Sequence, residues 1–128
     1  MYKLNGVMYS AEEIKSKVKE LAKQIEKDYA GEELLVVGIL KGASVFCADL
    51  IREIDLDVRM DFMVVSSYGN ETSSSGTVKI IKDLDVDIEN KNVLIVEDII
   101  DSGLTLSSLV AALETRKPKS LKLCTLLD

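Results

Sequence analysis

The sequence predicts a three-layer α/β protein, in which a twisted and mostly parallel β-sheet lies between helices. Apolar runs of strand length recur, for example at 34–40 and 93–96, and continuous apolar runs are typical of strands buried on both faces. Segments with apolar residues at helical spacing lie between these runs, and strands that alternate with helices usually form parallel sheets. With 128 residues, 47% of them hydrophobic, we expect one domain over residues 1–128.

The first half of the chain predicts a helix, a strand and a second helix. Ser10, followed three residues later by Glu13, forms a capping-box pattern that starts a helix reaching to about residue 30. Gly31 is suited to the turn after that helix. An apolar strand at 34–40, a turn with Gly42 and a helix to about residue 54 then form a βα unit.

The second half predicts four further strands and one helix. Strands are expected at 58–65, 77–81, 93–96 and 121–127, and a helix at 104–113. The segment 66–76 is rich in serine and too polar to pack, so we expect a mobile loop there. The segment 83–92 reads as an acidic turn region.

The most informative motif follows the strand at 93–96. Glu97 and Asp98 come first, and a helix-starting turn then contains Asp101, Ser102, Gly103, Leu104 and Thr105. Helix N-terminal amides can bind a phosphate without a basic side chain, and residues 92–115 contain no Lys or Arg. Carboxylates suit sugar hydroxyls and hydrated Mg²⁺, so the motif predicts a ribose-phosphate site at the carboxyl end of a parallel strand. A structural alternative is that Ser102 or Thr105 only caps the helix.

Composition and spacing exclude several classes of protein. A receiver domain carries its acidic pair after the first strand, whereas only 30 residues follow Asp98 here. The charge of −6 argues against nucleic acid or an anionic membrane as a partner, and the absence of histidine excludes Ser-His or Cys-His catalysis. Cys47 and Cys124 lie in apolar segments and predict buried free thiols. Without a signal or membrane-spanning pattern, we expect a cytoplasmic protein.

The motif resembles the phosphoribosyl pyrophosphate (PRPP) signature of the type I phosphoribosyltransferases. Three further segments, 35–43, 60–69 and 121–128, resemble the bacterial hypoxanthine-guanine branch of that family, so the resemblance covers nearly the whole chain. It implies the family fold, with one antiparallel strand and a hood over the sheet. It also implies transfer of the 5-phosphoribosyl group of PRPP to hypoxanthine or guanine, which releases pyrophosphate and yields IMP or GMP.

The resemblance also implies roles for individual residues. Lys41 and Gly42 match the pyrophosphate-binding turn. Glu97 and Asp98 match the residues that hold the ribose hydroxyls and the water ligands of Mg²⁺. Asp101 matches the catalytic base that faces the purine N7 and also belongs to the PRPP site. The 5-phosphate cradle matches Ser102, Gly103, Leu104 and Thr105, and the flexible active-site loop matches Ser66, Ser67 and Tyr68.

The family pattern extends beyond residue 128, into elements that bind the purine. We therefore expect the chain to be the core of the family domain, C-terminally truncated relative to it, with little or no activity as an isolated 128-residue polypeptide. The resemblance further implies a homo-oligomer, a dimer or a tetramer. Two alternatives remain, a non-catalytic PRPP-binding regulator and an inert PRPP-binding fragment; the charge of −6 disfavours the regulator, which would need a basic nucleic-acid surface.

Overall fold

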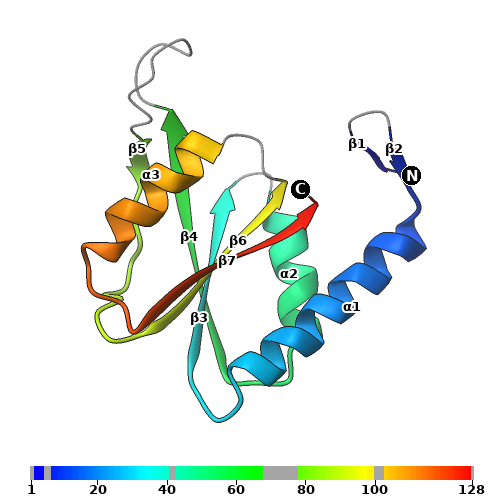
Figure 1. The fold of residues 1–128 in the computed structure, drawn as a ribbon, viewed down its shortest axis with the longest axis horizontal. Coiled ribbons are helices and arrows are strands. Elements are labelled where there is room, and N and C mark those ends of the chain that lie inside the picture. Colours follow the sequence, from blue (N-terminus) through cyan, green and yellow to red (C-terminus); the bar gives the residue numbers. More distant parts are fainter. Residues whose placement is uncertain (1, 5–6, 41–42, 68–77, 100–102, 128) are drawn as a thin grey trace.

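The computed structural model describes residues 2–4, 7–40, 43–67, 78–99 and 103–127 (Figure 1). Within them the chain forms a short N-terminal hairpin and a five-stranded sheet with three helices. The elements in order are β1 (Tyr2–Leu4), β2 (Val7–Tyr9), α1 (Ala11–Asp28), β3 (Leu34–Leu40), α2 (Ser44–Glu53), β4 (Val58–Ser67), β5 (Val78–Lys82), β6 (Asn92–Ile99), α3 (Gly103–Glu114) and β7 (Ser120–Leu127).

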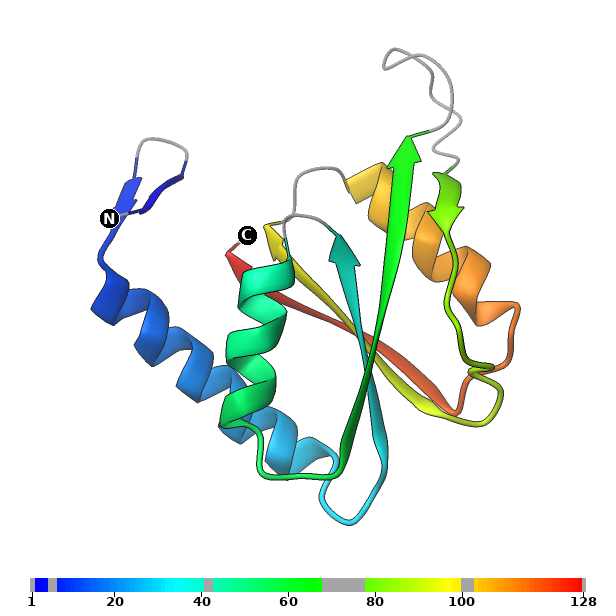
Figure 2. The same cartoon turned by 180° about the vertical axis from the view of Figure 1, so that it is seen from behind.

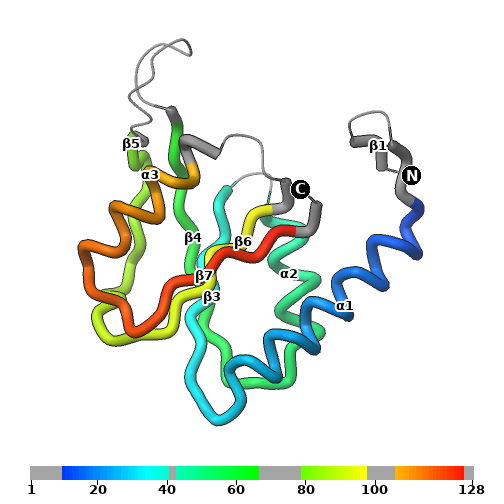
Figure 3. Tube along the Cα trace, viewed as in Figure 1, coloured from blue at the N-terminus to red at the C-terminus, as the bar shows by residue number. Residues whose placement is uncertain are grey.

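The main sheet has the strand order β5-β4-β3-β6-β7. The pairs β3–β4, β3–β6 and β6–β7 are parallel, and β5 runs antiparallel to β4. Val37 of the central strand lies opposite Asp61 of β4 and Ile95 of β6. The Cα trace shows β7 next to β6 (Figure 3). The predicted mostly parallel sheet and the single antiparallel strand are thereby confirmed.

Helices cover both faces of the sheet. Helices α1 and α2 lie on one face and α3 on the other (Figure 2). Successive residues of β3 alternate between the two cores, because side chains along a strand point to opposite faces. Val36 packs with the side chains of α1 and α2, whereas Val37 packs with Leu109 and Leu113 of α3. The three-layer prediction is confirmed, and the continuous apolar runs exist because both faces of the strands are buried.

The first helix begins as its capping box predicts. The Ser10 hydroxyl accepts a hydrogen bond from the Glu13 backbone N–H at 3.1 Å, and the Glu13 carboxylate accepts one from the Ser10 backbone N–H at 3.1 Å. The helix ends at Asp28, two residues before the expected end. Gly31 then takes a φ of +77°, a backbone conformation that favours glycine.

Several expected boundaries differ from the structure. The hairpin of β1 and β2 was not predicted, because three-residue strands are too short to show a periodic pattern. Strand β4 continues through Ser66 and Ser67, which pair with Lys79 and Val78. The prediction that the loop begins at residue 66 is therefore wrong by at least two residues. These serines extend the strand because the antiparallel partner β5 takes up their backbone groups. The rest of that expected loop, residues 68–76, lies outside the described residues.

Candidate functional site

The carboxyl ends of the parallel strands form the candidate site. Strand β3 ends at Leu40 and β6 at Ile99, and because the two strands are parallel their ends lie at the same edge of the sheet (Figure 1). Helix α2 begins at Ser44 shortly after β3, and α3 begins at Gly103 shortly after β6. Two helix N-termini therefore lie at this edge.

Glu97 lies where the buried part of β6 gives way to a more exposed position. The preceding residues Val93, Ile95 and Val96 are fully buried, whereas Glu97 is partly exposed and lies opposite Thr125 of β7. Strand alternation places Glu97 on the same face as Val93 and Ile95, which is the face covered by α3. The buried core thus fixes a carboxylate beside the carboxyl edge. Strand β6 is longer than expected and includes Glu97 and Asp98.

The electrostatics of the two helix N-termini favour an anion. The first backbone amides of a helix have no partner within the helix and carry partial positive charge. Helix α1 has Glu12 and Glu13 in its first turn, but the first turns of α2 and α3 contain no acidic residue. The residue before α2, Ala43, makes no side-chain capping bond. The positive ends of α2 and α3 are therefore not neutralised by acidic side chains of their own first turns.

Some of the other predicted site residues lie in described helices or strands, and the rest lie outside the described part of the chain. Gly103, Leu104 and Thr105 form the first turn of α3, and the prediction of a helix start after the acidic motif is confirmed within one residue. Ser66 and Ser67 end β4, two and three residues beyond the last pair of β4 with β3, and they pair with β5. The remaining predicted residues lie outside the described part of the chain: Lys41, Gly42, Tyr68, Asp101 and Ser102.

Gly38 is a residue beneath the site that the sequence analysis missed. It lies in β3 opposite Phe62 of β4 and Val96 of β6. A Cβ atom at position 38 would lie 2.8 Å from Cε1 of Phe62 and 3.2 Å from Sγ of Cys47. Real Cβ atoms do not approach a ring so closely, so glycine is what lets Phe62 lie against β3. The signal in the sequence was a glycine interrupting an apolar strand, which often marks a close approach.

The two cysteines are structural. Cys47 and Cys124 are free and buried, as predicted. Burial, with a smaller contribution from Cys124, raises the pKa of the Cys47 thiol to about 11, and burial raises the pKa of Cys124 to about 11. Because the thiolate is the nucleophilic form, neither cysteine is suited to nucleophilic chemistry near neutral pH.

A cavity of about 700 Å³ lies at the opposite edge of the sheet, where the parallel strands begin. Four of its charged lining residues form two pairs: Lys119 Nζ donates to Glu32 Oε1 at 2.8 Å, and Arg59 Nε lies 3.7 Å from Glu33 Oε1. Asn92 donates to the same Glu32 oxygen at 3.2 Å. Open parallel sheets bind ligands at the carboxyl ends of their strands. This cavity lies at the opposite ends, so we do not count it as part of the candidate site.

The described residues lack two other features, a metal-binding cluster and a membrane-spanning helix. They contain no group of three or more His, Cys, Asp or Glu side chains that could hold a metal ion. Among the helices that the structure describes, none has the length and apolar character to cross a membrane.

Comparison with known proteins agrees with this arrangement. Residues 8–128 match the family described as the phosphoribosyl transferase domain. The hypoxanthine-guanine phosphoribosyltransferase of Bacillus subtilis is 57% identical over 98% of this chain and 69% of that protein. A bifunctional protein TilS/HprT of Listeria innocua is 56% identical, with 98% of this chain covered but only 19% of that protein.

A solved structure gives the same result for the fold. The crystal structure of a hypoxanthine-guanine phosphoribosyltransferase from Bacillus anthracis is 54% identical and superposes with a TM-score of 0.88, covering 97% of this chain and 73% of that one. The chain thus spans about two thirds to three quarters of its single-function relatives. It belongs to the phosphoribosyl transferase family, in the branch of the hypoxanthine-guanine phosphoribosyltransferases.

Proposed function

We propose that this chain carries the PRPP-binding centre of a purine-salvage enzyme, which transfers the 5-phosphoribosyl group of PRPP to hypoxanthine or guanine. The products are pyrophosphate and IMP or GMP. The observation that carries the proposal is the arrangement of β6 and α3, which brings Glu97 and a helix whose first turn contains no acidic residue to one edge of the sheet. The named relatives are transferases, which favours catalysis over the regulator and the inert fragment.

The two ends of PRPP need different groups. The amides of Ser102, Gly103, Leu104 and Thr105 would bind the 5-phosphate, because a helix N-terminus stabilises an anion. Lys41 and Gly42, which follow β3 in the chain, would bind the pyrophosphate group. This separation leaves the carboxylates of Glu97 and Asp98 for the ribose hydroxyls between the two ends.

The same carboxylates suit Mg²⁺. Hard cations prefer oxygen ligands, and Glu97 presents a partly exposed carboxylate beside the carboxyl edge. Glu97 and Asp98 would hold the ion through its water ligands. When bound, Mg²⁺ supplies positive charge that stabilises the oxygens of the departing pyrophosphate.

The purine must lose a proton as the new bond forms. Asp101 would face the purine N7 and, as the general base, would accept the proton from that nitrogen. Ser66, Ser67 and Tyr68, at the end of β4 and just beyond it, would shield the reacting carbon from water. The free buried thiols of Cys47 and Cys124 suit a reducing compartment, so we place the protein in the cytoplasm. Membership of the family is the ground for expecting a homo-oligomer.

Calorimetric titration with PRPP, with and without Mg²⁺, tests the proposal. We expect binding that depends on Mg²⁺, is weakened by Glu97→Gln, and is blocked by Gly103→Val, whose side chain would obstruct the helix amides. Glu33→Gln is the matched control, because Glu33 lies at the opposite edge of the sheet. Equal affinity with and without Mg²⁺ would contradict the assigned roles.

An assay of IMP formation tests the catalytic step. In a chain completed by the C-terminal elements of the family, Asp101→Asn should lower turnover by roughly 10²–10⁴-fold, the usual contribution of general acid-base catalysis, and should weaken PRPP binding much less. Unchanged turnover would remove Asp101 from the proton-transfer role.

A further inference from the structure

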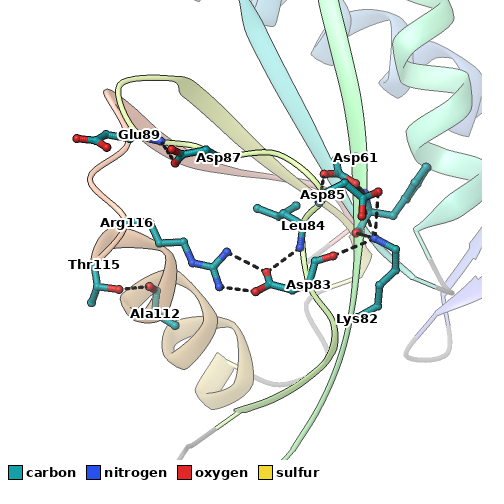
Figure 4. Close-up of polar contacts among 11 residues, drawn as sticks. Asp61, Lys82, Asp83, Leu84, Asp85, Asp87, Glu89, Ala112, Thr115 and Arg116 are labelled. Atoms are coloured by element: carbon teal, nitrogen blue, oxygen red, sulfur yellow. Dashed lines mark hydrogen bonds and ion pairs between the residues drawn. The ribbon is translucent and has the colours of Figure 1, made fainter.

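A polar cluster joins the β4–β5 pair to the far end of α3 (Figure 4). Its members are Asp61 of β4, Lys82 at the end of β5, Asp83 directly after it, and Arg116, two residues after the end of α3. We call these four residues the clamp. None of them belongs to the candidate site, since the clamp lies at the C-terminal end of α3 and the site at its N-terminal end.

The first half of the clamp ties the segment after β5 to β4. The Asp61 side chain is 8% exposed, and its two oxygens accept hydrogen bonds from the backbone N–H groups of Phe62 and Asp85, each at 2.8 Å. Lys82 Nζ donates to the Phe62 carbonyl at 3.0 Å and the Asp83 carbonyl at 2.9 Å, and lies 3.8 Å from Asp61 Oδ1. A buried carboxylate with these partners is well satisfied and holds its neighbours in place.

A bulge in β5 places Lys82 for this role. Val64 lies opposite Lys82, but the next residue, Val65, lies opposite Ile80, so Ile81 has no partner of its own. An extra residue of this kind bends the strand and redirects the side chains after it. The bulge therefore ends the regular pairing at the point where the clamp begins.

The second half of the clamp ties the same segment to α3. Arg116 forms two parallel hydrogen bonds with Asp83, Nη1 to Oδ1 and Nη2 to Oδ2, each at 2.9 Å. These hydrogen bonds lower the pKa of the Asp83 carboxyl. A bidentate pair fixes orientation as well as distance, which a single lysine contact does not. Leu84, next to Asp83, packs in the core between the sheet and α3.

We propose that the clamp positions α3 so that its N-terminus meets the 5-phosphate, with Arg116 as a positioning residue. This inference rests on the proposed function. Helix α3 has 12 residues and is about 18 Å long, so Arg116 acts through the helix and not by touching the ligand. Displacement of binding groups by about 1 Å can cost roughly 100-fold in rate, so a partial loss of alignment is measurable.

The proposal predicts a selective effect. Lys41 and Gly42, the proposed pyrophosphate-binding residues, follow β3 in the chain and are not part of α3. Loss of the clamp should therefore weaken binding of ribose 5-phosphate and PRPP, while pyrophosphate affinity stays unchanged. General destabilisation of the fold would weaken all three ligands together.

The experiment is calorimetry with these three ligands in the presence of Mg²⁺, on the full chain and its variants. For Arg116→Gln we expect roughly tenfold weaker binding of ribose 5-phosphate and PRPP, and partial recovery in Arg116→Lys. Asp83→Asn is the second variant, because its amide oxygen can still accept from the Leu84 N–H. The matched control is Arg52→Gln, which breaks an exposed ion pair with Asp49 on α2.

Each outcome separates the clamp from the proposed function. Unchanged ribose 5-phosphate affinity in Arg116→Gln and Asp83→Asn, or equal weakening of all three ligands, would overturn the clamp. Failure of the unmodified chain to bind ribose 5-phosphate would overturn the proposed function and the clamp with it. Circular dichroism shows whether a variant is folded, and if Arg116→Gln is unfolded the decision rests on Asp83→Asn.

Discussion

Replacing Gly38 by alanine tests how tightly the centre of the sheet is packed. The new Cβ would lie 2.8 Å and 2.9 Å from two ring carbons of Phe62, so the ring or the strand must move. Overpacking of this kind costs about 1–3 kcal/mol of unfolding free energy. At roughly 4 °C per kcal/mol for a domain of this size, the melting temperature should fall by about 4–12 °C.

A double-mutant cycle identifies the cause of that loss. Phe62→Leu removes the clashing ring atoms, so Gly38→Ala should cost less in that background, with a coupling of at least about 0.5 kcal/mol. Gly31→Ala is the control: it is strained by its φ of +77° but has nothing within 4 Å, so its cost should add to that of Phe62→Leu. Chemical denaturation measures all four corners of each cycle. An undiminished melting temperature in Gly38→Ala, or strict additivity with Phe62→Leu, would refute the reasoning.

Three further predictions concern other parts of the fold. Iodoacetamide at pH 8 should label Cys47 and Cys124 slowly in the native chain and rapidly in urea, as followed by mass spectrometry, because burial raises the pKa of both thiols to about 11; equal rates would contradict this. Lys117 has a φ of 58°, so Lys117→Gly should raise the unfolding free energy in urea by about 0.5–1 kcal/mol, whereas Glu114→Gly within α3 should lower it. Because folding lowers the pKa of Asp83, its carboxylate stabilises the folded state above the unfolded pKa, and this stabilisation is lost as the pH falls through the folded pKa. The difference in unfolding free energy between the unmodified chain and Asp83→Asn should therefore shrink below about pH 3.8. A difference that is independent of pH would contradict this.

Local signals were sufficient where neighbouring residues interact. The capping box of Ser10 and Glu13 spans three residues, and both of its hydrogen bonds are present. The residues of the run at 93–96 pack on both faces of the sheet, so all four are apolar, and this continuous apolar run is what predicted a buried strand. The acidic residues and the helix start that follow are consecutive in the chain, so the strand-to-helix order of the candidate site could be predicted without any knowledge of distant contacts.

The fold class, the motif at the end of β6 and the burial of both cysteines could be predicted from the sequence, because each depends on hydrophobic pattern or on residues close together in the chain. Contacts between distant segments could not be predicted, because they depend on how the strands pair and the helices pack. Asp83 and Arg116 are 33 positions apart, and nothing in either exposed residue type indicates a partner. The approach of Phe62 to Gly38 likewise depends on the pairing of β3 with β4. Hydrophobic pattern places a residue inside or outside, whereas register and strand order decide which two residues meet.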